Sequence, residues 1–148
     1  MTIKNYPLWS ELPELELYLD QVLLYVNQVC KDQLLTGDKG LTAAMVNNYV
    51  KLGSLAKPVK KKYNRQQIAR LIVITTLKNV FRIQEISPAL TQLTDNNQSE
   101  VMYNHFVQAM SGQNDQDIPK LIKAACETAL SYQYTYRLLQ ELETQHES

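Results

Sequence analysis

The sequence predicts a mainly α-helical protein that folds as a single domain over residues 1–148. The chain has 148 residues, of which 45% are hydrophobic, so it is long enough for one buried core and short for two independent domains. Apolar residues recur at helical spacing in several segments, and capping residues stand where those segments begin. One stretch, residues 54–63, loses this spacing and carries Pro58 and three consecutive lysines. We therefore expect helices interrupted by one short basic β-hairpin or loop.

The first two helices are predicted on either side of a glycine-containing turn. Residues 17–34 carry apolar side chains three and four positions apart, and the segment Thr-Gly-Asp-Lys-Gly ends this pattern. A shorter helix should follow, because Thr42 can cap its first turn and Gly53 can adopt the left-handed backbone that ends it. The apolar stripe of this shorter helix consists of Met45, Val46, Tyr49 and Val50.

The centre of the fold is predicted to be a helix over residues 65–81. Asn64 can cap this helix, and Gln67 stands where the partner of a capping box would stand. The helix is apolar on nearly every side, which indicates burial all round. After it, Ser87 followed by Pro88 is a second helix start signal.

Two further helices are predicted in the C-terminal part. Residues 99–110 form one of them, and the last helix should run from about Asp117, with Pro119 in its first turn, to Thr144. Apolar and aromatic residues of this last helix alternate steps of four and three, which is the spacing of a packing seam. Two interpretations stay open: the seam joins two copies in a homodimer, or it packs on its own domain. The seam residues are Ile118, Ile122, Ala125, Ala129, Tyr132, Tyr136 and Leu139.

Charge is strongly segregated along a chain whose formal net charge is zero. Residues 39–84 contain ten Lys or Arg and no Asp or Glu, whereas residues 1–38 sum to −4 and residues 85–148 to −6. Such segregation creates a local potential that attracts polyanions whatever the net charge of the whole chain. A solvated helix face, the alternative interpretation, usually carries both signs. We therefore expect an anion-binding surface in the middle of the chain.

The order of the predicted elements suggests what this surface binds. A helix, a tight connection, a short capped helix, a basic hairpin and a long buried helix follow one another, which is the plan of a winged helix-turn-helix. In that plan the short helix enters the DNA major groove and the hairpin holds adjacent phosphates. We expect residues 17–86 to form the DNA-binding part and residues 87–148 a helical lobe for dimerisation or signal reception.

Two resemblances support this interpretation. The segments MVNNYVKLGSL and KKKYNRQQIARLIVITTLKNVFRIQEI are similar to the DNA-binding region of MerR-type regulators, which implies a MerR-like helix-turn-helix. In that resemblance Asn47 takes the place of an arginine that contacts DNA. The segments LYLDQV, LTAAMVNNYVK and KPVKKKYNRQQIARLIVITTLK resemble the bacterial YkrK-like family, domain of unknown function 1836. That family implies the same fold and no established activity.

The residues of the expected DNA site divide by their chemistry. An asparagine amide carries the donor and the acceptor that match adenine N6 and N7, so Asn47 or Asn48 is expected to read a base edge. Lysine and arginine side chains suit phosphates, and Thr42 at a helix N-terminus can add a phosphate contact. Tyr63 either closes the hairpin onto the core or bonds a phosphate. The expected phosphate-binding cations are Lys51, Lys57, Lys60, Lys61, Lys62 and Arg65.

The sequence contains few of the residue patterns that enzyme active sites require. The only histidines, His105 and His146, lie far apart, and the four glycines form no phosphate-binding loop. Cys30 and Cys126 have no metal-type spacing and are expected to be reduced core residues. We expect no enzyme, no cofactor and no metal site.

The sequence also leads to expectations about the cellular location of the protein and the class of its partner. No apolar run approaches a membrane span, and the N-terminus lacks the order of a signal peptide, so we expect a cytoplasmic protein. Two alternatives to a DNA-binding regulator stay open. One is a protein-interaction adaptor whose basic face docks an acidic surface. The other is an RNA-binding accessory factor, which the lack of aromatic pairs disfavours. No residue pattern identifies a small-molecule effector.

Overall fold

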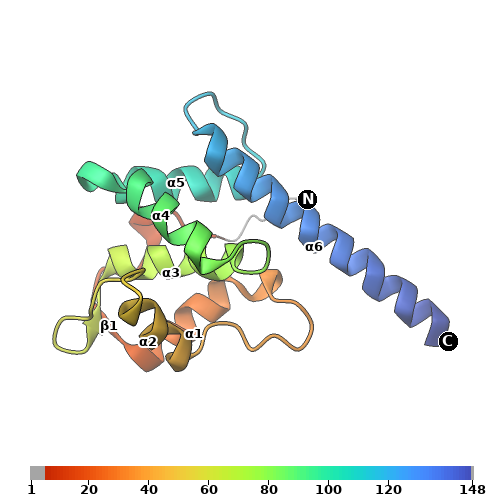
Figure 1. Ribbon diagram of the computed structural model, residues 1–148, viewed down its shortest axis with the longest axis horizontal. Helices are drawn as coiled ribbons and strands as arrows, with labels where there is room; N and C mark the ends of the chain where they lie inside the picture. The colour runs from red at the N-terminus through yellow and green to blue at the C-terminus, as the bar shows by residue number, and fades with distance from the viewer. Residues whose placement is uncertain (1–5, 148) are drawn as a thin grey trace.

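A computed structural model describes residues 6–147, except for the side chains of residues 96, 146 and 147. It confirms a mainly α-helical fold with one small antiparallel sheet (Figure 1). The elements in chain order are the 3-10 helix η1 (Trp9–Glu11), β1 (Leu17–Tyr18), α1 (Leu19–Val29), the 3-10 helix η2 (Lys31–Gln33), α2 (Ala43–Lys51), β2 (Lys62–Tyr63), α3 (Arg65–Leu77), α4 (Ile83–Leu93), the 3-10 helix η3 (Asp95–Asn97), α5 (Ser99–Met110) and α6 (Lys120–Glu147).

Helix α3 is the buried centre, as the sequence predicts. It packs against α1 on one side and against α4, α5 and α6 on the other (Figure 1). The predicted capping box is present: the Gln67 N–H donates to Asn64 Oδ1 at 2.9 Å, and the Asn64 N–H donates to Gln67 Oε1 at 2.7 Å. The helix ends at Leu77, four residues before the predicted end, and Phe81 is half-buried in the turn that follows.

Both predicted ends of helix α2 are confirmed. Thr42 Oγ1 accepts the N–H of Met45 at 3.3 Å, which caps the first turn. At the other end Gly53 has a φ of 77°, and the Ser54 N–H reaches the carbonyl of Tyr49 at 2.8 Å. This pairing is the Schellman motif, in which a left-handed glycine lets the chain turn sharply out of the helix. The stop sends the chain directly into the basic segment.

The predicted first helix is wrong at both ends. Leu17 and Tyr18 form strand β1, which pairs with Tyr63 and Lys62 in β2, and α1 begins only at Leu19. The strand depends on pairing with β2, a distant part of the chain that local apolar spacing does not reveal. Helix α1 then ends at Val29, and a segment with the short helix η2 leads to α2. The expected tight connection between these two helices is therefore also wrong.

The C-terminal helices follow the prediction except at two starts and at the end of α6, which lies at Glu147 and not at about Thr144. Helix α4 begins at Ile83 and not at Ser87, because Glu85 accepts the N–H of Arg82 at 3.0 Å and caps an earlier turn. Pro88 consequently lies inside the helix, where it removes one backbone hydrogen bond. Helix α5 has the predicted bounds, and α6 begins at Lys120 and projects from the body of the molecule (Figure 1).

Two further expectations can be compared with the described residues. Cys30 and Cys126 are free and buried, as expected of core cysteines. None of the helices described has the length and apolar content needed to cross a bilayer.

Candidate nucleic-acid interface

A two-residue turn carries Lys60 and Lys61 at the tip of the basic segment. Val59 and Lys62 exchange backbone hydrogen bonds of 3.0 and 2.9 Å across this turn. Lys60 has a φ of 51° and Lys61 a φ of 68°, so both occupy the left-handed region, as a type I′ turn requires. Left-handed backbone costs an L-residue about 1 kcal/mol or more, and this turn normally takes Asn and Gly. Both lysine side chains are exposed.

The strand after the turn anchors the segment to the fold. The Nζ of Lys62 lies 5.3 Å from the centre of the Tyr18 ring in β1, a cation–π contact. Tyr63 is only 3% exposed, and burial raises its pKa. Of the two roles expected for Tyr63, closure of the hairpin onto the core agrees with this burial.

Helix α2 presents its polar residues to solvent. Asn47, Asn48 and Lys51 are exposed, whereas Val46 and Tyr49 on the opposite side are buried. No hydrogen bond ties either asparagine amide to another described residue. Both amides are therefore free to meet a ligand. The N-cap hydroxyl of Thr42, half-buried, is engaged with its own helix.

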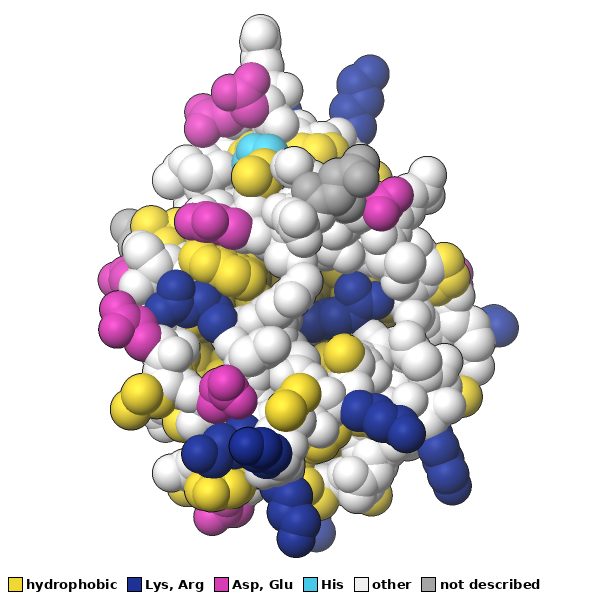
Figure 2. Space-filling view, turned by 90° about the vertical axis from the view of Figure 1, so that its left-hand side faces the viewer, with side chains coloured by type: hydrophobic (Ala, Val, Ile, Leu, Met, Phe, Trp, Pro, Cys, Tyr) yellow, Lys and Arg dark blue, Asp and Glu magenta, His cyan; other side chains and the backbone are white. Residues whose placement is uncertain are grey.

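Lysine and arginine side chains gather around α2 and the turn. Figure 2 shows them over the lower part of one face, with isolated Asp or Glu side chains among them. Among described residues, Lys51, Lys57, Lys60 and Lys61 form no ion pair, whereas Lys78 pairs with Asp38 at 3.5 Å. The charge separation is less complete in space than in sequence, because β1 brings its exposed neighbours Glu16 and Asp20 beside β2.

Arg65 does not join the exposed lysines. Its Nη2 donates to the carbonyl of Leu12 at 3.3 Å, and its Nε is buried without a described partner. The side chain is half-buried against the N-terminal segment. The structure thus leaves the asparagines and Lys51 exposed on α2 and Lys57, Lys60 and Lys61 exposed on the basic segment, both at the lower end of the molecule (Figure 1), and turns Arg65 inward.

Sequence reasoning missed Arg70, which fastens the basic segment to the helices behind it. Its Nε donates to the carbonyl of Ser54 at 2.7 Å, and its Nη2 donates to Thr91 Oγ1 on α4 at 3.1 Å. Burial lowers the pKa of this guanidinium. The available signal was its position: a single arginine among Ile68, Ala69, Leu71 and Ile72 on a helix that is otherwise apolar there.

The predicted seam of α6 divides between two environments. Its first members pack on the protein's own core: Ile118, which precedes α6, is buried, as are Ile122 and Ala129, and Ala125 is half-buried. Further along, Tyr132 is 42% and Leu139 55% exposed, and Tyr136 is half-buried with its ring stacked on Tyr132. The helix is also held by Gln133, whose Nε2 donates to the carbonyl of Asp32 at 2.8 Å, and by a hydrogen bond between Gln140 and Thr36.

Candidate metal ligands do not cluster in the part of the chain that is described. No three His, Cys, Asp or Glu side chains there converge as metal ligands. His105 is half-buried on α5, and the side chain of His146 lies outside the described residues.

Comparison with known proteins gives one match. Residues 7–106, which include the asparagines, the lysine turn and α3, match the model of the family described as Domain of unknown function (DUF1836). The comparisons with curated proteins and with solved structures found no match. Because the matched segment spans more than half of the chain, this protein belongs to the DUF1836 family.

Proposed function

We propose that this protein binds double-stranded DNA in a sequence-specific manner and acts, without enzymatic activity, as a cytoplasmic bacterial transcriptional regulator. In this proposal α2 is the recognition helix of a MerR-like winged helix-turn-helix, and the turn at Lys60 and Lys61 is the tip of its wing. The segment between α1 and α2 is longer than the usual turn of this motif, so the proposal rests on α2 and the wing.

The observation that carries the proposal is the pair of lysines in left-handed backbone at an exposed turn. Strained backbone of this kind concentrates at functional sites, because a sequence selected for stability alone replaces it. Asn and Gly would relieve the strain, yet the chain keeps two cations at the tip. Binding of a polyanion by these two lysines explains why the chain keeps them in a strained turn.

Base reading is assigned to the exposed amides of α2. A bidentate contact from Asn47 or Asn48 to an adenine discriminates by about 1 to 3 kcal/mol against another base. The two side chains point in directions about 100° apart on a helix, so one of them reads the base edge. Lys51, Lys57, Lys60 and Lys61 hold phosphates on either side.

Useful specificity from so short a helix needs two half-sites about one helical turn apart. The exposed part of the α6 seam, Tyr132 and Leu139, is the surface we assign to the homodimer contact. Helix α6 lies outside the segment that matches the family, so this dimer is a property proposed for this chain.

The test is binding to a pool of random duplex DNA, measured by fluorescence anisotropy at about 50 and 200 mM salt, followed by sequencing of the bound fraction. Four or five phosphate contacts predict a loss of about two to three decades in affinity between these salts. A double variant, Lys60→Ala with Lys61→Ala, should flatten this dependence. Lys120→Ala with Lys123→Ala, which removes charge from α6 instead, is the matched control.

Each outcome of this experiment decides between partner classes. An enriched, two-fold symmetric motif supports a dimeric regulator. Binding of equal strength to single-stranded RNA, without an enriched duplex motif, favours the RNA-binding factor. Absence of binding at low salt overturns the proposal and leaves an acidic protein surface as the partner of the lysines.

A further inference from the structure

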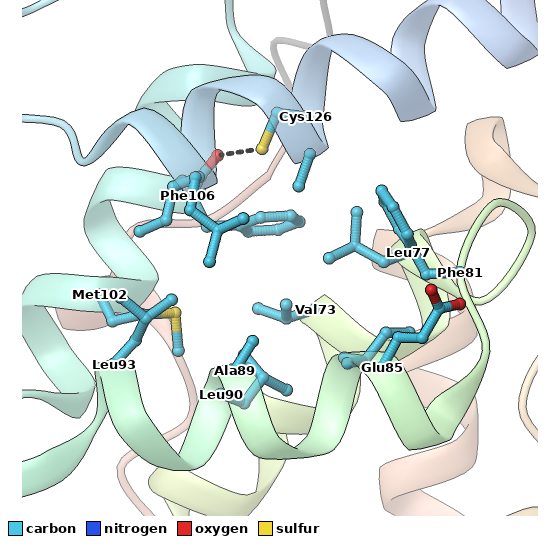
Figure 3. A pocket seen from close by; sticks show the side chains of 14 residues that line it. Val73, Leu77, Phe81, Glu85, Ala89, Leu90, Leu93, Met102, Phe106 and Cys126 are labelled. Carbon is cyan, nitrogen blue, oxygen red and sulfur yellow. Dashed lines mark hydrogen bonds between the residues drawn. The ribbon is translucent and has the colours of Figure 1, made fainter.

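An apolar cavity lies between α3, α4, α5 and α6, away from the lysine turn (Figure 3). Its volume is ≈ 220 Å³. Figure 3 shows Val73 and Leu77 of α3, Ala89 and Leu90 of α4 and Met102 and Phe106 of α5 around a common space, with Cys126 of α6 above it. All lining residues except Glu85 are apolar.

Apart from Glu85 and Cys126, the lining side chains offer no hydrogen-bonding group to a bound water. None of the buried polar atoms without a described partner belongs to a lining residue. The Cys126 thiol points to the carbonyl of Phe106 at 3.9 Å, and burial raises its pKa to about 12, so it stays neutral. Apolar cavities of about 150 Å³ in other proteins bind benzene or xenon.

Two lining residues, Glu85 and Leu121, are exposed and mark the mouth of the cavity. The Glu85 carboxylate already accepts the N–H of Arg82 as a helix cap, at 3.0 Å. It therefore does not serve as an anchor inside the cavity, and its negative charge disfavours an anion at the entrance. The ligand that fits is neutral as well as apolar.

We propose that this cavity is a binding site for a small neutral apolar molecule of the size of a single substituted aromatic or alicyclic ring. The volume exceeds that of a benzene site by room for a short substituent. Burial of apolar surface without a polar anchor supplies the affinity, so shape and neutrality define the ligand class. This inference does not rest on the proposed DNA binding.

The experiment uses the full chain and fluorobenzene as the probe. Titration followed by fluorine NMR should give a dissociation constant of about 1 mM or tighter, in line with the efficiency of very small ligands. Methyl resonances of Leu93, Met102 and Ile122 should shift on binding, whereas those of Val59 on the lysine turn should not. Benzoate should bind at least about tenfold more weakly, because its charge would enter an apolar site.

Two neighbouring alanines of α6 provide a matched pair. Ala125 lines the cavity and is half-buried, whereas Ala124 is exposed on the same helix and does not line it. Ala125→Leu should fill the space and weaken fluorobenzene binding at least about tenfold, and Ala124→Leu should leave it unchanged. Ala89→Leu fills the cavity from α4 if the first variant does not fold.

Three results would overturn the inference. One is the absence of binding to the wild-type protein. Another is unchanged affinity in both cavity-filling variants, and the third is methyl shifts confined to residues away from the cavity. The wild-type methyl map decides the matter even if neither filling variant folds.

Discussion

Asn27 on α1 holds the backbone of Leu41 through two hydrogen bonds. The Leu41 N–H donates to Asn27 Oδ1 at 2.8 Å, and Asn27 Nδ2 donates to the Leu41 carbonyl at 3.0 Å. One amide thereby fastens the long segment after α1 just before the N-cap of α2. The clamp stands where the sequence pattern predicted a tight turn, and it holds the chain just before the Thr42 cap of α2.

Gly40 makes this clamp feasible, so we predict that Gly40→Ala destabilises the fold. A Cβ at Gly40 would collide with Asn27 Oδ1, and the φ of 76° adds backbone strain. We expect a loss of about 2 to 4 kcal/mol in the free energy of unfolding, measured by urea denaturation. Gly37→Ala is the control, because Gly37 has a φ of 83° and open space around it. Equal losses in the two variants would show that the contact with Asn27 is unimportant.

The lysine turn leads to a prediction in which stability and binding move in opposite directions. Replacing Lys60 by Asn and Lys61 by Gly should raise the free energy of unfolding by about 1 to 2 kcal/mol, because these residues suit a type I′ turn. The same variant should lose DNA affinity and reduce the salt slope by about 1.8. Lys57→Ala, which removes a cation outside the left-handed turn, should weaken binding without a gain in stability. Unchanged DNA affinity in the double variant would remove the wing from the interface.

The proposed recognition helix is tested by Asn47→Ala. This exposed substitution should leave the urea midpoint nearly unchanged and weaken the enriched DNA site by about 1 to 3 kcal/mol, while binding to random DNA stays the same. Asn48→Ala, made in parallel, identifies which amide reads the base. Equal loss on the enriched site and on random DNA would contradict base reading by Asn47.

The features that the sequence predicted correctly are local ones. Thr42, Asn64 and Gly53 act on backbone groups within a few residues, so their positions alone indicated the ends of α2 and the start of α3. The pairing of Leu17 with Tyr63 could not be predicted in this way, because strand pairing depends on residues far apart in sequence. The helix start predicted at Ser87 and Pro88 was wrong because Glu85 caps an earlier turn and the helix tolerates the proline.

The candidate site was predictable to the same degree. Exposure of Asn47, Asn48 and Lys51 follows from the apolar stripe on the other side of α2. The inward turn of Arg65 and the bonds of Arg70 depend on the carbonyls of Leu12 and Ser54, which no sequence spacing reveals. The cavity could not be predicted from the sequence pattern, because it is a gap left where four helices pack.

The two buried thiols predict how stability depends on pH. Burial raises the pKa of Cys30 to about 11 and that of Cys126 to about 12, from an ordinary value of 9.0. The folded chain therefore keeps protons that the unfolded chain releases, so the contribution of the two thiols to the free energy of unfolding is constant up to about pH 9 and falls from there to about pH 12. Urea denaturation across this range measures the fall. The Cys30→Ala and Cys126→Ala double variant should show a shallower fall, and an unchanged slope would assign the fall to groups other than the two thiols.

The exposed part of α6 predicts self-association. Tyr132 and Leu139 lie on one side of α6, which projects from the body (Figure 1), while Gln133, about 100° round the helix, bonds to Asp32. Sedimentation velocity at high micromolar concentration should therefore show a dimer for the wild type. Tyr132→Glu with Leu139→Glu should give a folded monomer, because both side chains are exposed and charge opposes the contact between copies. Leu24→Glu alters an apolar residue on α1 that is 76% exposed, and it should leave the dimer intact. A monomeric wild type would mean that the seam serves only the protein's own core, and a dimer that survives both glutamates would place the interface elsewhere.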